Sequence, residues 1–252
     1  MGPTWVNRAF LYSGTSYGII RNPDWGSKGH PKYLKNRLIA HTDPAKSGGD
    51  SSTIPNNPVT IFDLMNEKSN ATWKVYSGDY GSKIYGGYIG HIYPKLYNKN
   101  FSHFASVAQF EKDVANNQLP LVSFLDASLS GDEDPMNGQS EHPAQNIQRG
   151  QRWVAERIST IMTNPDVWKG TVVLLTYDES GGFYDHVPPP AATPPDAFLP
   201  ISSAVSGAKN KGNYFFDYYG FRVPLIVVSP FAKPHFVSHK VYDHTSILRF
   251  IE

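Results

Sequence analysis

Three short, uninterrupted runs of apolar residues constrain the fold more than any other feature of this sequence. They are PLVSFLD at 120–126, TVVLLTYD at 171–178 and RVPLIVVSP at 222–230. Each run is rich in β-branched or aliphatic side chains and is bounded by Pro, Gly or Asp. Runs of this kind are typical of strands covered on both faces, which occur in mostly parallel sheets. A weaker, alternating segment at 72–80 predicts a fourth strand nearer an edge.

Helical segments separate these strands. In residues 144–168 the apolar side chains recur close to every 3.6 residues, and Asn164-Pro165 predicts the end of that helix. Another helix follows a capping box made by Thr60 and Asp63. Further helices are expected at 103–117 and from 243 to the last residue. This alternation predicts an α/β fold: an α/β/α sandwich with a mostly parallel central sheet, in a single domain at 1–252.

Composition and charge exclude several classes of protein. The chain has 252 residues, a net charge of +1 and no cysteine. Because a nearly neutral chain has no general attraction to nucleic acid or anionic membranes, we expect no nucleic-acid partner. No apolar run approaches the ~18 residues that predict a transmembrane segment. The absence of cysteine excludes disulfide bonds, thiolate zinc sites and a cysteine nucleophile.

Acidic residues stand where two of the three apolar runs end. Asp126 closes the first run, and Asp178 with Glu179 closes the second. In parallel sheets, ligands collect at the carboxyl ends of the strands. Two carboxylates followed by a flexible turn at Gly181-Gly182 suit a divalent cation, because hard cations prefer oxygen donors. These residues therefore predict a cation site at this edge of the sheet.

Two histidines lie in loops that follow the predicted strands. His186 comes directly after Asp185 and is a candidate metal ligand, donor to a phosphate oxygen or general acid. The structural alternative is that Asp185 and His186 form a hydrogen-bonded pair that stabilises a turn. The acidic loop at 131–145 carries His142. Since this loop follows the strand at 120–126, His142 is a candidate for the same site.

The beginning of the chain supplies a hydroxyl, a carboxamide and a guanidinium within five residues, from Thr4, Asn7 and Arg8. A hydroxyl beside a divalent ion loses its proton more readily and can attack phosphorus or a carbonyl carbon. Arg8 could neutralise phosphate oxygens through two parallel hydrogen bonds. The alternative is that a helix begins here and Thr4 only caps it.

Six segments, taken in order, resemble one known family. They are GPTWVNRAFLYSGTSYG, LPLVSFLDA, SEHPAQNIQRGQ, TVVLLTYDESGGFYDHVPPP, GFRVPLIVVSPFAKP and DHTSILRFIE. Their order resembles that of the phosphatidylcholine-specific phospholipase C and acid phosphatase family, which belongs to the alkaline-phosphatase-like superfamily. The similarity runs from Gly2 to Glu252, and the string from Asp178 to Pro190 is its most specific part.

The resemblance implies a metal-dependent phosphoesterase with a threonine nucleophile. Thr4 matches that nucleophile, which would also touch the metal, and Asp178 and Glu179 match the acidic ligands of one divalent metal ion. Oxygen donors favour Mg, Mn or Ca, and nearby histidines leave Zn or Fe open. The remaining matches are His142 and His186 as catalytic residues near the phosphoryl group, and Asn7, Arg8 and His103 as substrate-binding residues.

The implied substrate is a phosphatidylcholine-like phosphodiester. Two alternatives stay open: a broad-specificity acid phosphatase that acts on phosphomonoesters, and a catalytically inactive fragment that binds phosphate-bearing ligands. Val6 stands where the family has Pro, and the family's Glu-Asn-x-Ser-Phe-Asp segment, which supplies further metal ligands, has no counterpart. We therefore expect a fragment truncated at both ends. A secreted or periplasmic location is implied by analogy alone, and the oligomeric state has no signature in the sequence.

Overall fold

The computed structural model describes residues 2–18, 58–80, 89, 93–128, 138–197 and 216–252. The chain forms two compact units, each built from segments that are far apart in the sequence. Unit 1 combines Met1–Leu64, Asp178–Val223 and Tyr242–Glu252, and unit 2 combines Met65–Tyr177 and Pro224–Val241.

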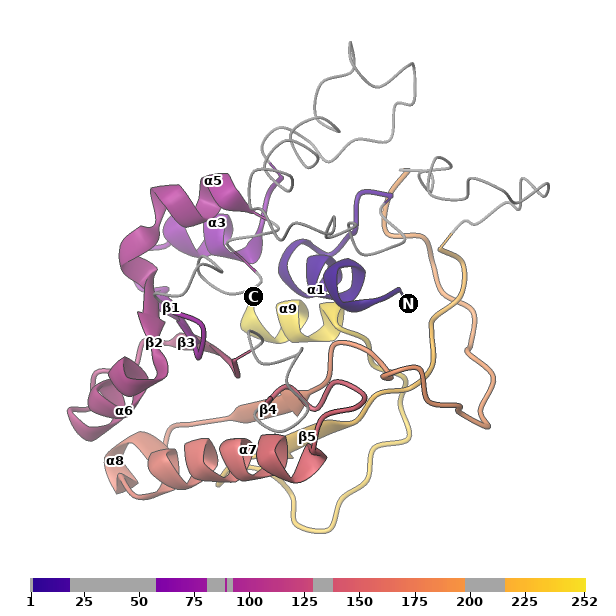
Figure 1. Ribbon diagram of the computed structural model, residues 1–252. Coiled ribbons are helices and arrows are strands. Elements are labelled where there is room, and N and C mark those ends of the chain that lie inside the picture. Colours follow the sequence, from indigo (N-terminus) through magenta and orange to yellow (C-terminus); the bar gives the residue numbers. More distant parts are fainter. Residues whose placement is uncertain (1, 19–57, 81–88, 90–92, 129–137, 198–215) are drawn as a thin grey trace. The chain divides into compact units, whose positions relative to one another are not determined.

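A parallel sheet forms the centre of unit 2 (Figure 1). Its strands are β1 (Trp73–Ser77), β2 (Phe104–Ser106) and β3 (Val122–Asp126), in the order β2-β1-β3. Val75 of β1 lies opposite Phe104 of β2 and Phe124 of β3. The α/β class and the parallel sheet predicted from the sequence are thus confirmed. The prediction that β1 lies near an edge is wrong, because β1 is the central strand of this sheet and four of its five residues are buried.

Helices complete the core of unit 2. They are α5 (Pro94–Lys99), α6 (Val107–Ala115), α7 (Ile147–Met162) and α8 (Pro165–Trp168). Of these helices, α6 packs directly on the parallel sheet. Tyr76 of β1 packs edge-on against Phe110 of α6, with 5.4 Å between ring centroids. Val114 of α6 and Ile161 of α7 belong to the same buried cluster. Asn164 ends the long helix as predicted, since its side chain accepts hydrogen bonds from the first backbone amides of α8.

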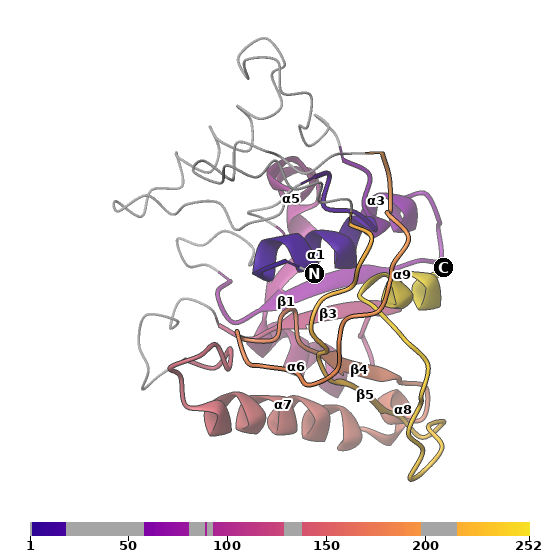
Figure 2. The ribbon, with the colours of Figure 1, turned by 90° about the vertical axis from the view of Figure 1, so that its right-hand side faces the viewer.

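The other two apolar runs pair with each other in unit 2. They form β4 (Val173–Thr176) and β5 (Leu225–Val228), which run antiparallel, with Val173 opposite Val228. Both views place α7 alongside this pair (Figure 2). We expected parallel strands covered on both faces, but Leu225 to Val227 are exposed. An apolar run predicts that a strand forms, whereas its direction and covering depend on what packs against it.

The segment at 103–117 differs from the single helix that we expected. It begins with a 3-10 turn (Phe101–His103) and continues as β2, and only Val107–Ala115 is α-helical. Ser106 sets this boundary, because its hydroxyl accepts a hydrogen bond from the backbone amide of Gln109.

Unit 1 contains the first and last helices of the described chain. These helices, α1 (Thr4–Ser13) and α9 (Thr245–Ile251), lie side by side (Figure 1). Gly14 ends α1 in the left-handed conformation, with φ of 72°. The predicted capping box is confirmed: the backbone amides of Thr60 and Asp63 each donate to the other's side chain at the start of α3 (Ile61–Asn66).

Candidate functional site

Thr4 is the first residue of α1, and its side chain is buried. Pro3 occupies the cap position of this helix, and no side chain caps it. The alternative in which Thr4 only caps the helix is therefore wrong. At the first helical position, the Thr4 hydroxyl lies where the helix dipole favours negative charge, which suits a hydroxyl that reacts with a phosphoryl group.

The next turn of α1 contacts the acidic segment in unit 1. The Asn7 carboxamide donates to the backbone carbonyl of Asp178 at 2.7 Å. Arg8 Nε lies 2.9 Å from Asp178 Oδ2, and both side chains of this ion pair are half-buried. In a helix, residues three and four positions after Thr4 share its face. Asn7 and Arg8 thus bring the helix that carries Thr4 together with Asp178.

The Asn7 side chain has a second task. Its Oδ1 accepts from the Gly2 backbone amide at 2.9 Å, and its Nδ2 donates to the Gly2 carbonyl. Asn7 is only 1% exposed. Through its hydrogen bonds to Gly2 and to Asp178, it joins the start of the chain to the acidic segment. The predicted roles of Asn7 and Arg8 in substrate binding stay predictions.

A tight turn follows the acidic pair. Asp178 and Glu179 lie in a bend and are half-buried. Gly181 and Gly182 then adopt φ of 66° and 76°, a region that side chains with a Cβ rarely enter. The sharp reversal of the chain that we predicted from these glycines is present.

The donor chemistry of Asp178, Glu179 and Thr4 fits a divalent cation, since all three offer oxygen atoms. Within the described ranges, no group of three or more Asp, Glu or His side chains gathers closely enough to hold a metal. Arg8 contacts Oδ2 of Asp178. Because a carboxylate has two oxygens, one can face a guanidinium while the other faces a cation. Metal binding here stays a prediction.

Asp185 stabilises its loop, as the structural alternative expected, but its hydrogen-bond partners are Arg222 and Val187 and not His186. Its carboxylate accepts from the backbone amide of Val187 at 3.1 Å and from Nε and Nη2 of Arg222, both at 2.8 Å. The hydrogen bond from Arg222, followed by that from the Val187 amide, lowers the pKa of Asp185 well below its usual range. The loop that carries His186 is thereby tied to the segment that enters β5.

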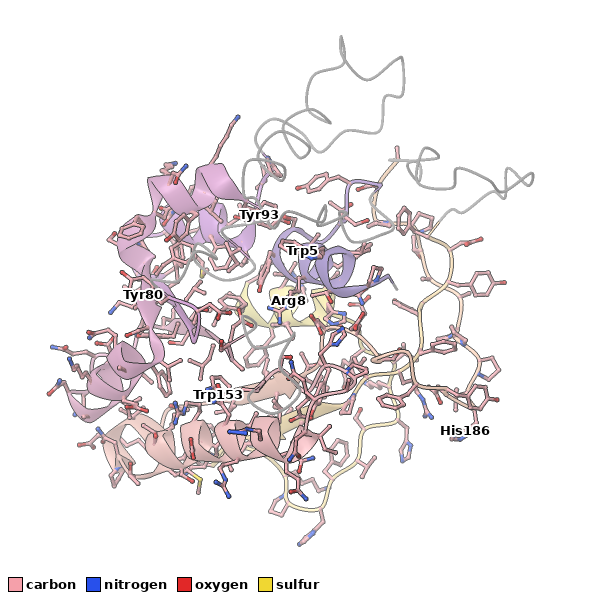
Figure 3. All side chains as sticks on the ribbon, in the orientation of Figure 1. Trp5, Arg8, Tyr80, Tyr93, Trp153 and His186 are labelled. Carbon is pink, nitrogen blue, oxygen red and sulfur yellow. The ribbon has the colours of Figure 1, made fainter. Side chains whose placement is uncertain are left out.

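His186 itself points outward from this loop (Figure 3). Its side chain is 82% exposed, and Nδ1 lies 3.8 Å from Asp185 Oδ1, beyond hydrogen-bonding distance. The sequence predicts that His186 acts at the same site as Asp178. In the structure it faces solvent, and its catalytic role stays a prediction.

We expect Arg222→Gln to raise the pKa of Asp185 toward its usual value of about 3.9, because Arg222 is the main cause of the lowered pKa. A lowered pKa in the folded protein stabilises it above about pH 4, and this contribution is lost as the pH falls through the lowered pKa. The measurement is an NMR titration of the Asp185 carboxyl together with acid unfolding. Arg249→Gln, which removes an exposed pair with Glu252, is the matched control. An unchanged Asp185 pKa in Arg222→Gln would contradict the assignment.

His142 lies in unit 2, in the loop before α7, and its side chain is exposed. Residues 131–137 of the predicted acidic loop lie outside the described residues. The backbone amide of His142 donates to the Ser140 hydroxyl at 3.3 Å, and the backbone amide of Gln145 donates to the His142 carbonyl at 2.9 Å. Backbone hydrogen bonds thus fix the position of His142 while its ring remains accessible.

His103 lies at the amino end of the parallel sheet in unit 2. Its ring stacks on Trp73, with 4.1 Å between centroids, and its Nδ1 lies 2.8 Å from the Trp73 carbonyl oxygen. Trp73 is the first residue of β1, whereas Asp126 ends β3 at the carboxyl edge. These contacts are those of a structural histidine, and its assignment to substrate binding stays a prediction.

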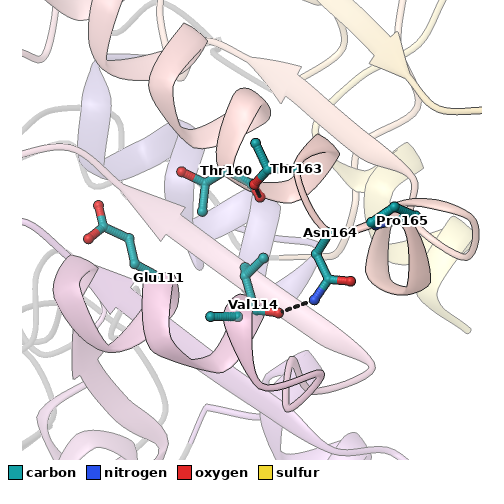
Figure 4. Close-up of a pocket in the computed structure, with 7 residues that line it drawn as sticks. Glu111, Val114, Thr160, Thr163, Asn164 and Pro165 are labelled. Carbon is teal, nitrogen blue, oxygen red and sulfur yellow. Dashed lines mark hydrogen bonds between the residues drawn. The ribbon is translucent and has the colours of Figure 1, made fainter.

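A separate pocket of ≈ 280 Å³ opens between α6 and the end of α7 (Figure 4). Asn164 in its wall donates to the Val114 carbonyl at 2.7 Å, and the hydroxyls of Thr160 and Thr163 donate to carbonyls of their own helix. The polar side chains of this wall thus form hydrogen bonds with backbone carbonyls near the ends of α6 and α7. The predicted site residues do not line it.

The sequence analysis missed two residues that organise these loops, Arg222 and Tyr177. Arg222 pairs with Asp185, and the Tyr177 hydroxyl donates to Glu141 Oε2 at 2.8 Å. Burial and this hydrogen bond raise the pKa of Tyr177 to about 12. The only signal in the sequence was position, because Arg222 begins one predicted strand and Tyr177 stands just before the acidic pair that ends another.

The sequence of this chain matches the model of one protein family. The model of the family described as "Phosphoesterase family" matches residues 1–252. The chain belongs to the phosphoesterase family. This confirms the resemblance found in the sequence.

Several curated proteins are similar to this phosphoesterase-family chain. Phospholipase C B of Mycobacterium tuberculosis is 31% identical over 73% of the chain and 36% of its own length. Non-hemolytic phospholipase C of Pseudomonas aeruginosa is 30% identical, covering 100% of the chain and 35% of that protein. Non-specific phospholipase C6 of Arabidopsis thaliana is 28% identical, covering 98% and 41%. The matched region thus covers between 35% and 41% of the length of these relatives.

Among the helices in the described ranges, none combines the length and the apolar character that crossing a membrane requires.

Proposed function

We propose that this chain contributes to a hydrolase of phosphoester bonds of the phospholipase C type. One observation carries the proposal: Asn7 and Arg8, one turn after Thr4, contact the backbone and the carboxylate of Asp178. The helix that begins at Thr4 is thereby joined to the acidic turn, an arrangement that suits phosphoryl transfer to a hydroxyl. Membership of the phosphoesterase family and the names of its relatives support the same function.

In the proposed reaction Thr4 is the nucleophile. Its Oγ attacks phosphorus in line with the leaving oxygen, so that the Oγ–P bond forms as the bond from phosphorus to the leaving alcohol breaks. Charge spreads over the other phosphoryl oxygens, where the N-terminus of α1 offers partial positive charge. Water then attacks the phosphothreonine and releases the phosphoryl product and free Thr4.

Asp178, Glu179 and Thr4 are the residues that we propose to hold one divalent ion. Bound there, it would supply Lewis-acid stabilisation of the phosphoryl oxygens and ease the loss of the Thr4 proton. The ion pair with Arg8 orients the Asp178 carboxylate for this task.

Histidines are the proposed proton donors to the leaving alcohol. His142 and His186 are both exposed, so each can meet a substrate that arrives from solvent. Proton transfer from such a group typically contributes ~10²–10⁴ in rate. Arg8, Asn7 and His103 stay proposed substrate-binding residues, although the first two already contact Asp178.

The proposed substrate is a phosphodiester of the phosphatidylcholine type, because the similar proteins are named phospholipases C. The test is hydrolysis of phosphatidylcholine vesicles against p-nitrophenyl phosphate by the protein as produced from its gene, with Mg, Mn, Ca, Zn or Fe added in turn. We expect the phosphodiester to be cleaved faster and turnover to depend on one added ion.

Faster cleavage of p-nitrophenyl phosphate would instead support an acid phosphatase. Phosphate binding measured by calorimetry without hydrolysis of either substrate would favour an inactive ligand-binding protein. Both results would contradict the proposed phospholipase C activity.

A further inference from the structure

We propose that Glu141 is a positioning residue for His142, and that Gly150 and Tyr177 hold Glu141 in place. The inference rests on the proposed function, because it gives His142 a defined place in that reaction. The four residues lie in unit 2. Nothing in the motif itself assigns a task to Glu141, which stands just before His142 in the sequence Glu-His-Pro.

The loop that carries His142 has an unusual backbone. Glu141 has φ of 61° and Ala144 has φ of 80°, a region that residues other than glycine rarely occupy. Such conformations persist only where the surroundings enforce them, and they cluster at functional sites. Two strained residues therefore flank His142 and Pro143, and contacts outside the loop have to maintain them.

The first enforcing contact is with Gly150, a buried glycine inside α7. A Cβ placed on Gly150 would lie 2.7 Å from Glu141 Oε1 and 2.8 Å from the Gln139 carbonyl oxygen, and closer still to Glu141 Cγ. No side chain fits in that space. The Glu141 side chain thus lies across α7 at the one point where the helix presents bare backbone.

The second contact fixes the end of the same side chain. The Tyr177 hydroxyl donates to Glu141 Oε2 at 2.8 Å. Tyr177 follows β4 and stands directly before Asp178 in the chain. Glu141 therefore links the loop of His142 to the exit of the strand that leads into the acidic turn.

Within the loop, a short set of hydrogen bonds transmits this anchoring to His142. The Ser140 hydroxyl donates to Gln145 Oε1 at 3.2 Å and accepts from the His142 amide at 3.3 Å. The Gln145 amide closes the turn by donating to the His142 carbonyl at 2.9 Å. A shift of Glu141 would move both ends of this turn and so displace the imidazole.

The test is Gly150→Ala, with Gly170→Ala as the matched control because a Cβ at Gly170 meets nothing within 4 Å. Alanine favours helix more than glycine does, so the substitution itself does not weaken α7. We expect Gly150→Ala to lower kcat by about 10- to 100-fold with KM nearly unchanged, since a small misplacement of a catalytic group costs about that much. Because the added Cβ also crowds the Gln139 carbonyl, some loss of thermal stability is expected in Gly150→Ala, and Tyr177→Phe, which adds no atom, tests the positioning without that crowding.

Two further substitutions separate positioning from general damage. Tyr177→Phe should lower kcat in the same direction, and Glu141→Gln, which can still accept from Tyr177, should keep most of the turnover that Glu141→Ala loses. Hydrogen exchange of the Gln145 amide gives a readout independent of activity: it should speed up in Gly150→Ala and stay unchanged in Gly170→Ala.

The outcomes distinguish this inference from the proposed function. If His142→Ala keeps wild-type turnover, His142 has no catalytic role, and the positioning role of Glu141 is overturned with it. Turnover that depends on His142 but not on Gly150 or Tyr177 would overturn the positioning alone. Wild-type exchange of the Gln145 amide in Gly150→Ala would do the same without an assay of turnover.

Discussion

Thr4→Ala should abolish turnover of phosphodiester and phosphomonoester alike, with kcat reduced by about 10³-fold or more, because the atom that attacks phosphorus is lost. Trapping with a radiolabelled phosphoester should give no covalent phosphoenzyme. Stability should change little, because Pro3 and not Thr4 occupies the cap position of α1. The loss would thus lie in chemistry rather than in folding.

Two other substitutions at this position sharpen the result. Thr4→Ser keeps a hydroxyl and should keep measurable turnover and phosphoenzyme. Thr4→Val keeps the branched shape of this buried side chain and lacks only the hydroxyl, so it should be as inactive as Thr4→Ala. Near-normal rates in Thr4→Val would make Thr4 a packing residue and exclude the proposed nucleophile.

The strands were predictable from the sequence because their signal is local. Short apolar runs predicted β3, β4 and β5 within a few residues of their observed bounds. Their surroundings were not predictable in this way. The alternation of β1 indicated a strand nearer an edge, and yet β1 lies at the centre of its sheet, because it pairs with β2 on one side and with β3 on the other. The short β2 was hidden within the segment that we expected to be helical.

Part of the candidate site could be predicted from motifs and from their positions at the ends of predicted strands. Thr4 and Asp178 were expected to lie near each other, and the contacts of Asn7 and Arg8 with Asp178 support that expectation. Arg8 contacts the carboxylate of Asp178, and its expected role in binding phosphate stays a prediction. A guanidinium suits either partner, and only the fold decides which one it reaches.

Contacts between side chains that are far apart in the chain could not be predicted from the sequence. Glu141 meets Tyr177 across 36 positions, and Asp185 meets Arg222 across 37. No periodicity or spacing encodes such a pair, because it forms only when two loops fold against each other. Both pairs hold a loop that carries a candidate histidine. The residues that hold these loops were therefore found only in the structure, whereas the proposed reactive residues were already predicted from the sequence.

Asp178→Asn should raise the concentration of divalent ion needed for half-maximal turnover by about 10- to 100-fold, because the carboxamide keeps the shape of the side chain and loses the charge that attracts a cation. Calorimetric titration of the ion into the protein should show the same loss without any substrate. Asp185→Asn is the matched control, since it too removes the carboxylate partner of an arginine, at a place outside the proposed cation site. It should leave the metal affinity unchanged. Equal metal affinity in the wild type and in Asp178→Asn would mean that Asp178 serves only as the partner of Arg8, and the cation would have to be held by other residues.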